Sequence, residues 1–129
     1  MAIDYQIFAD RQVIVAEATG PINLSRSKRA IQAISSDSQY SEGFEVLIDL
    51  RQVTGHLGIA SVFELATALE RPNSLLPTYR KVAIVVADGR TFDEAEFLEL
   101  CTQNRGVNMR WFTSRTAAQA WLEAEVPQT

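Results

Sequence analysis

The residues that could do chemistry gather around His56, the only histidine of the chain. Histidine is the side chain whose ordinary pKa lies closest to neutral pH, so His56 could act as a general acid or base. Asp49 and Ser61 flank it in the sequence, and the three could form a serine, histidine and aspartate triad. No Gly-x-Ser-x-Gly turn presents the serine, so the sequence favours structural roles for these residues.

Cys101 is the only cysteine, which excludes an intrachain disulfide and a cluster of cysteine ligands. It shares the apolar side of a predicted helix with Phe97 and Leu98, away from any base or helix N-terminus, so we expect it to pack in the core. A zinc site needs three or four ligands, which one histidine without a cysteine pair does not supply. We therefore predict no metal, no cofactor and no enzymatic activity.

The segment 51–58, with the sequence RQVTGHLG, is predicted to be a loop before a helix, and its backbone amides could bind an anion. It lacks the lysine and hydroxyl of a phosphate-binding loop. Loops at the carboxyl edge of a parallel sheet are where binding residues concentrate, so we expect the functional surface here. The candidate binding residues are Arg51, Thr54, Gly55, His56 and Gly58, joined by Arg90 and Phe92 from the loop after the next strand. Alternatively, Arg51 only pairs with Asp49 or Glu45, and the glycines only make the turn.

Apolar periodicity predicts the elements that position this loop. Alternation and turn residues indicate five strands, and i, i+3, i+4 spacing indicates four helices. Asn23 is a predicted helix cap, Ser114 or Thr113 is predicted to cap the last helix, and Thr91 with Glu94 forms a predicted capping box. The predicted strands cover residues 3–8, 13–20, 44–50, 82–87 and 107–112, and the helices cover about residues 24–36, 59–71, 91–105 and 114–126.

This order predicts an α/β fold: one domain over residues 1–126 with a mixed five-stranded sheet, β-β-α-β-α-β-α-β-α, flanked by four helices on both of its faces. Residues 127–129 are expected to be a frayed tail. The strands at 44–50 and 82–87 are apolar on both faces and should be central, and those at 3–8 and 107–112 should be edges. Trp111 and Trp121 are expected to pack together. The predicted buried stripes are Ile59, Val62, Phe63, Ala66 and Leu69 in the second helix, and Ala117, Ala120, Trp121 and Ala124 in the last.

Charge and composition narrow the classes of partner. The formal net charge is −4 and the pI is near 5.0, which disfavours nucleic acid and anionic membrane surfaces. Arg26, Lys28 and Arg29 are interpreted as the solvated face of a helix. No apolar run approaches the ~18 residues of a membrane span, and the first residues do not resemble a secretory signal, so a cytoplasmic location is expected.

Three stretches carry a resemblance to a known family: VLIDLRQVTG at 46–55, KVAIVVAD at 81–88, and the ending RWF-x5-A-x-x-WL at 110–122. Together with the element order, they resemble the STAS domains of anti-sigma-factor antagonists, and most of all the uncharacterised bacterial STAS-like proteins. In that family a kinase phosphorylates the serine of a D-S-[ST]-G motif at the start of the second helix, which ejects a bound partner. Aligning through the strand places residues 57–60, Leu-Gly-Ile-Ala, at this motif, so the phosphorylated hydroxyl is missing.

The resemblance implies a noncatalytic protein-interaction or regulatory module whose partner is another protein. The alternative is a protein that binds a small ligand, such as a lipid, a nucleotide or another anion, through the 51–58 loop. A monomer or a homodimer is expected, because unprotected sheet edges invite pairing.

Overall fold

The computed structural model describes residues 1–129 except 42, 71–79, 88–89, 104–107 and 125–129. The predicted tail at 127–129 and the end of the predicted domain at 126 therefore lie outside the described residues. The observed order is β-β-α-β-α-β-α-β-α, as predicted. Its elements are β1 (Ala2–Phe8), β2 (Val13–Pro21), α1 (Leu24–Ser36), β3 (Glu45–Thr54), α2 (Ile59–Glu70), β4 (Lys81–Val85), α3 (Arg90–Gln103), β5 (Met109–Phe112) and α4 (Arg115–Glu123).

The five strands form one sheet in the order β1-β2-β3-β4-β5. β1 pairs antiparallel with β2, and the remaining neighbours are parallel. The predicted mixed sheet is confirmed, with β3 at its centre and β1 and β5 at its edges. The residues of β4 are buried throughout, as a strand covered on both faces requires.

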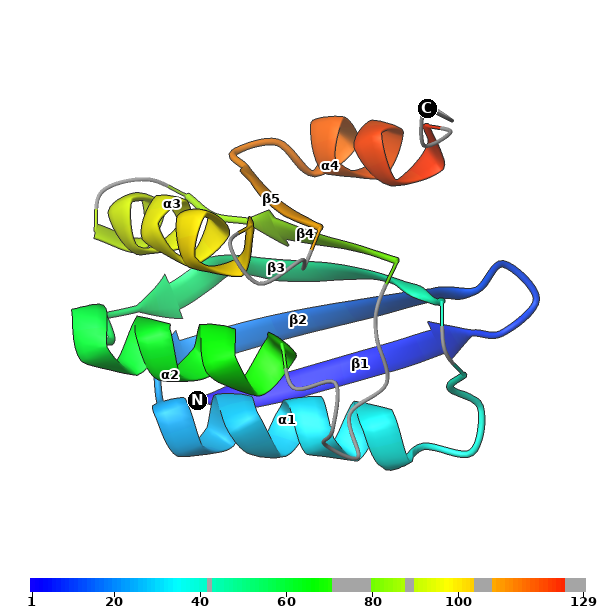
Figure 1. The fold of residues 1–129 in the computed structure, drawn as a ribbon, viewed down its shortest axis with the longest axis horizontal. Coiled ribbons are helices and arrows are strands. Elements are labelled where there is room, and N and C mark those ends of the chain that lie inside the picture. The colour runs from blue at the N-terminus through cyan, green and yellow to red at the C-terminus, as the bar shows by residue number, and fades with distance from the viewer. Residues whose placement is uncertain (42, 71–79, 88–89, 104–107, 125–129) are drawn as a thin grey trace.

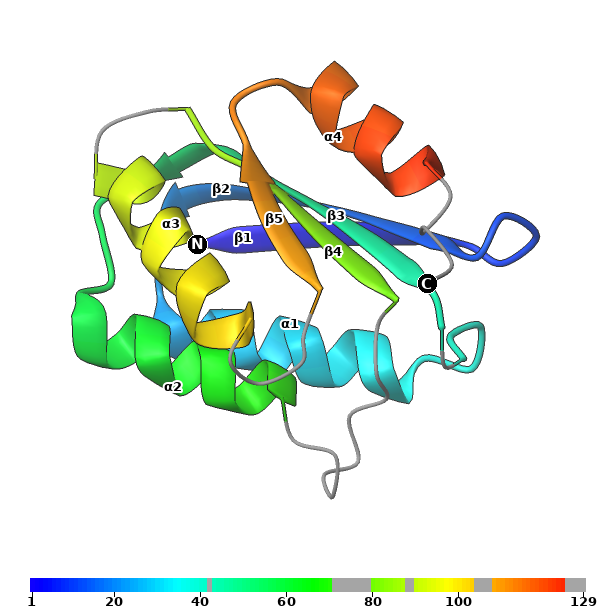
Figure 2. The same ribbon diagram turned by 45° about the horizontal axis from the view of Figure 1, so that its top comes forward.

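The helices are divided unequally between the two faces of the sheet (Figures 1 and 2). α1, α2 and α3 contribute Ile34, Val62 and Leu98 to the core on one face, whereas α4 alone contributes Ala118 and Leu122 to the other. The strand order explains this division, because right-handed crossovers that always step in the same direction place their helices on the same face. The predicted covering of both faces is confirmed, with α1, α2 and α3 on one face and α4 on the other, because the chain order has no reversal that would move a crossover helix to the far face.

Side-chain caps fix two helix starts as predicted. The side chain of Asn23 accepts a hydrogen bond from the Arg26 amide at 3.0 Å, and Ser114 accepts one from the Ala117 amide at 3.2 Å. At the other end of α4, the buried Lys81 ammonium donates to the carbonyls of Trp121 and Ala124 at 2.7 and 2.6 Å. This cation satisfies carbonyls at the negative end of the helix, so it ties α4 to the sheet.

Two packing predictions for the C-terminal part are wrong. Trp111 packs with the core on the α1–α3 face, while Trp121 packs against Phe112, with ring centroids 5.7 Å apart, on the α4 face. Successive strand residues point to opposite faces, so Phe112 meets α4 and Trp111 does not. In α4 the buried residues are Ala118 and Leu122, and the predicted stripe residues Ala117 and Ala120 are exposed.

Candidate functional site

The connection between β3 and α2 is shorter than the predicted loop 51–58. β3 continues to Thr54, which pairs with Pro21 of β2, so only residues 55–58 connect the two elements. Gly55 and Gly58 have φ values of 77° and 89°, in the left-handed region that side chains with a Cβ rarely adopt. These two glycines are therefore required by the turn itself. Arg51 and Thr54, predicted in the loop, lie on the strand.

The start of α2 is held by a carboxylate from the neighbouring helix. The Leu57 amide donates to both carboxylate oxygens of Glu94, at 3.1 and 2.9 Å, and the Gly58 amide donates to Oε2 at 2.6 Å. Glu94 lies near the start of α3, so this is a contact between two helices, and the Thr91 side chain of the predicted capping box lies outside the described residues. A carboxylate is favourable here because a helix N-terminus carries partial positive charge. The amides predicted to bind an external anion thus bind an anionic side chain of the protein itself.

Asp49 and Arg51 form an ion pair, which was the alternative predicted from the sequence. The Arg51 guanidinium donates to the two Asp49 oxygens through Nε at 3.0 and 3.2 Å and through Nη2 at 2.7 Å, and the Arg51 amide adds a bond of 3.1 Å. Arg115 at the start of α4 lies 3.5 Å from Asp49 and 2.9 Å from Glu17. These hydrogen bonds from Arg51 lower the pKa of Asp49 despite its burial. Asp49 therefore interacts with two arginines.

Replacing Asp49 with asparagine should lower the free energy of unfolding at neutral pH by about 1–2 kcal/mol, because charge-assisted hydrogen bonds are lost at a buried site. The folded pKa of Asp49 lies below its ordinary value of 3.8, so the carboxylate stabilises the fold above that value and its contribution disappears as the pH falls through the folded pKa. Urea denaturation at pH 7 and at pH 3 measures this effect. The difference in free energy of unfolding between wild type and variant should be smaller at pH 3 than at pH 7. A difference that does not depend on pH would contradict the stabilising role of the ionised Asp49.

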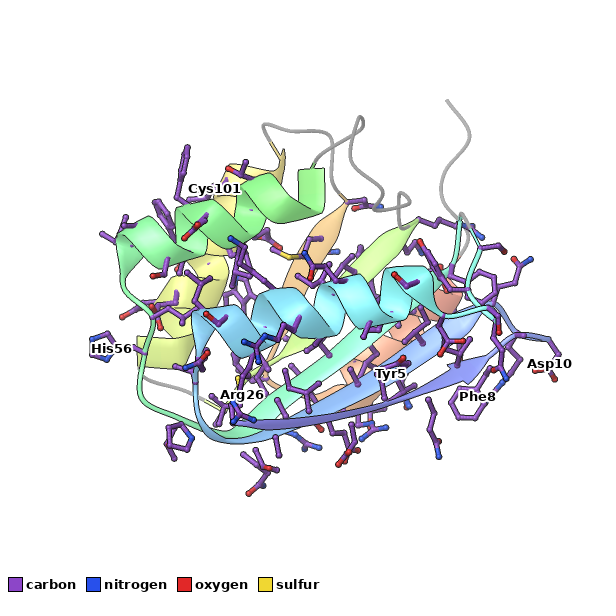
Figure 3. All side chains as sticks on the ribbon, turned by 90° about the horizontal axis from the view of Figure 1, so that it is seen from below. Tyr5, Phe8, Asp10, Arg26, His56 and Cys101 are labelled. Atoms are coloured by element: carbon purple, nitrogen blue, oxygen red, sulfur yellow. The ribbon has the colours of Figure 1, made fainter. Side chains whose placement is uncertain are left out.

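The predicted site residues lie at the same end of the sheet but not in one cluster. Thr54, Gly55 and His56 are exposed, Gly58 is half-buried beneath Glu94, and Arg51 points to the α4 face. Figure 3 shows His56 projecting outward at the end of the molecule opposite Phe8 and Asp10. The side chains of Arg90 and Phe92 lie outside the described residues. The contact of Glu94 with Leu57 nevertheless places the start of α3 beside this loop.

Two apolar side chains that the sequence assigned to the core are on the surface. Ile59 is 71% exposed and Phe63 is 50% exposed, while Val62 and Ala66 of the same helix are buried as predicted. Ile59 and Phe63 are four residues apart, so they lie on one side of the first turns of α2, directly after the loop. The core-facing side of α2 is centred on Val62 and Ala66, and Phe63 follows Val62 by about 100° around the helix. We call Ile59 and Phe63, with loop residues 55–58, the α2 surface.

An apolar cavity of about 130 Å³ lies beneath this surface, between the sheet and the helices. Its lining includes Leu57 of the loop, Ile31 of α1, Val62 of α2 and Glu94 of α3. The described residues thus line an apolar, partly open space beneath the candidate site. Cys101 is buried in the core of the same face, as predicted.

The comparisons with known proteins agree with this fold. The family model described as SpoIIAA-like matches residues 13–123. The solved structure of an anti-sigma factor antagonist from Mycobacterium paratuberculosis superposes with a TM-score of 0.61 at 18% identity, covering 95% of this chain and 96% of that one. An uncharacterised DUF3478-family protein with a SpoIIAA-like fold, from Shewanella loihica PV-4, gives a TM-score of 0.57 at 15% identity, covering 94% and 92%.

These matches confirm the predicted STAS-like resemblance and the fold class. At such identities the structural likeness establishes the fold alone. No curated protein matches the chain. Within the described residues, no helix is both long enough and apolar enough to cross a membrane.

Proposed function

The chain belongs to the SpoIIAA-like family, and from this premise we propose that it is a noncatalytic interaction module that binds a partner protein through the α2 surface. The observation that carries the proposal is the exposure of Ile59 and Phe63 on one side of α2. Large apolar side chains grouped on a surface and bordered by polar residues are typical of protein interfaces. The similar anti-sigma factor antagonist from Mycobacterium paratuberculosis supports a protein as the partner class.

The loop beside these residues supports the same reading. Glu94 fixes the Leu57 and Gly58 amides, and the two glycines adopt the positive φ values that this turn requires. A surface that is ordered before binding loses less conformational entropy on association. His56 within the α2 surface and Thr54 next to it provide exposed polar groups. The proposed binding residues are therefore Thr54, Gly55, His56, Gly58, Ile59 and Phe63, with Arg51, Arg90 and Phe92 retained at the same end of the sheet.

Partner binding should not depend on phosphorylation at this position. The family motif places its phosphorylated serine at Gly58, which has no hydroxyl, and the Gly58 amide already holds the Glu94 carboxylate at 2.6 Å. A permanent negative charge thus occupies the start of α2, where the family adds a phosphate transiently. We propose a constitutive interaction in place of a phosphoswitch.

Affinity capture from the native cells tests this proposal, with the wild-type chain and a variant of the α2 surface as parallel baits. The variant carries Ile59→Gln and Phe63→Gln. A protein recovered at near-stoichiometric amounts by the wild type and lost from the variant supports the proposal. Equal recovery by both baits, or no stoichiometric partner at all, would contradict it.

The apolar cavity favours a second candidate, binding of a small apolar ligand. A cavity of about 130 Å³ with apolar walls is close in size to engineered cavities that stay dry and bind benzene. Benzene should raise the melting temperature of the wild type, because a ligand that binds only the native state stabilises it. Ala30 lines the cavity, so the Ala30→Leu variant should fill part of it and lose this response. Identical responses of the two proteins would exclude the cavity as the binding site.

A further inference from the structure

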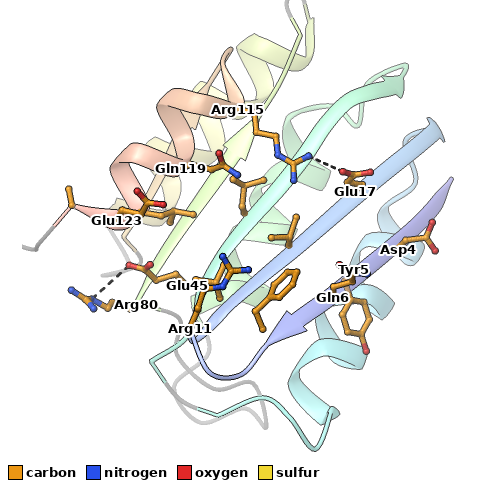
Figure 4. Close-up of a pocket in the computed structure, with 16 residues that line it drawn as sticks. Asp4, Tyr5, Gln6, Arg11, Glu17, Glu45, Arg80, Arg115, Gln119 and Glu123 are labelled. Carbon is orange, nitrogen blue, oxygen red and sulfur yellow. Dashed lines mark hydrogen bonds and ion pairs between the residues drawn. The ribbon is translucent and has the colours of Figure 1, made fainter.

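On the face of the sheet that carries α4, no helix of the described residues covers β1 and β2. α4 packs on β3, β4 and β5, so the outer strands lack a helix on this side. A groove of about 940 Å³ lies on this part of the face, between α4 and the β1–β2 hairpin (Figure 4). Its apolar lining includes Val13 and Val15 of β2, Leu47 of β3 and Leu122 of α4. This size lies within the range of small-molecule sites.

Glu45 supplies the groove with a buried acceptor. Its side chain is only 12% exposed, and among the described residues no donor forms a hydrogen bond with Oε2. Arg80 Nε lies 4.0 Å from this oxygen, beyond hydrogen-bond range, and the Arg80 side chain is 51% exposed. The nearby Lys81 ammonium is used by the α4 carbonyls. A buried carboxylate oxygen without a donor is uncommon, because its desolvation is not offset.

The surroundings of Glu45 disfavour its ionised form. Burial raises the pKa of Glu45 most strongly, and the charge of Glu123 raises it further, while Lys81 and Arg80 lower it. The ionised form is therefore less favourable in the folded protein than in the unfolded chain. Charges kept at the expense of stability concentrate at functional sites.

We propose that the groove binds a small organic cation, an amine on an apolar body, whose ammonium group meets Glu45 and Glu123 while the body lies on Val13, Val15 and Leu47. Oε2 is itself buried, so the ammonium group must displace the Arg80 side chain, 4.0 Å away, to supply the hydrogen bond that this oxygen lacks. The other cations of the groove are held elsewhere: Arg115 pairs with Glu17 at 2.9 Å, and the Arg11 guanidinium lies 4.6 Å from the centre of the Phe8 ring. This site is on the opposite face of the sheet from the α2 surface, so it stands independently of the proposed function.

Three probes with a phenyl ring on a short chain test the proposal by NMR titration of the full chain: phenethylamine, 2-phenylethanol and 3-phenylpropionate. Phenethylamine should shift the amide signals of Val13, Val15 and Leu47 in a saturable manner. Its affinity for the Glu45→Gln variant should be at least about tenfold lower than for the wild type. The alcohol and the acid should shift them little. Glu64→Gln, which removes an exposed carboxylate of α2, is the matched control and should bind like the wild type.

The Glu45→Gln variant should fold at least as stably as the wild type at neutral pH, because it removes a desolvated charge. Arg80→Gln gives an independent readout, since removing this competing cation should tighten amine binding several-fold. Equal shifts from all three probes, shifts confined to residues outside the groove, or unchanged amine binding in both variants would overturn the proposal.

Discussion

The Ile59→Gln, Phe63→Gln double variant should bind the partner about 100-fold more weakly than the wild type, while its free energy of unfolding changes by no more than about 1 kcal/mol. Both side chains are exposed in the free protein, so their removal takes little from the core. In a complex the same side chains would be buried. Truncating central apolar residues of an interface typically weakens binding by roughly 2 kcal/mol or more. Glutamine has a helix propensity at least as good as that of isoleucine or phenylalanine and leaves the net charge unchanged.

The matched control for this variant is on the other side of the sheet. Thr116 and Ala120 of α4 are also exposed and four residues apart, so Thr116→Gln with Ala120→Gln makes the same kind of change on a distant helix. Calorimetric titration of the captured partner against the three proteins measures the affinities, and urea denaturation measures the stabilities. Loss of affinity in the control, or retained affinity in the α2 variant, would place the interface elsewhere.

Replacing Glu94 with alanine should lower the free energy of unfolding by about 2 kcal/mol and increase hydrogen exchange at the Leu57 and Gly58 amides. Three contacts of 2.6–3.1 Å between this carboxylate and the two amides disappear together. The negative charge at the start of α2 disappears as well, which removes its interaction with the helix dipole. Glu94→Gln should fall between the two proteins, because an amide oxygen still accepts hydrogen bonds but carries no charge.

Glu96→Ala provides the control, since Glu96 is exposed on the same helix. Urea denaturation and amide exchange monitored by NMR compare the four proteins. The partner should also bind Glu94→Ala several-fold more weakly, because a loosened loop must be ordered on binding. Unchanged exchange at Leu57 and Gly58 would show that Glu94 does not hold the loop.

The order of the elements could be predicted from the sequence because each element carries a local signal. Alternation marks the edge strands, the unbroken apolar run marks β4, and Asn23 and Ser114 mark helix starts. The one-sided placement of α1, α2 and α3 depends on strand order, which local patterns do not contain. The same limit applies to Trp111, because its face is set by the register of a strand of only four residues.

The geometry around the predicted loop could be anticipated only in part. Glycines before an amphipathic pattern indicated the turn, and the alternative pairing of Arg51 with Asp49 was anticipated. The spacing of Thr91 and Glu94 indicated a local capping box, yet Glu94 binds amides about 37 residues away, where the fold brings a second helix N-terminus within reach. The exposure of Ile59 and Phe63 was missed because apolar residues extend around more of α2 than the sheet and neighbouring helices can cover.

Hydrogen exchange of the chain with and without its captured partner tests the central claim most directly. Partner binding through the α2 surface predicts slower exchange of amides in residues 55–63, with little change in β1 and in α4. Protection confined to the β1–β2 hairpin or to α4, with residues 55–63 unchanged, would contradict it.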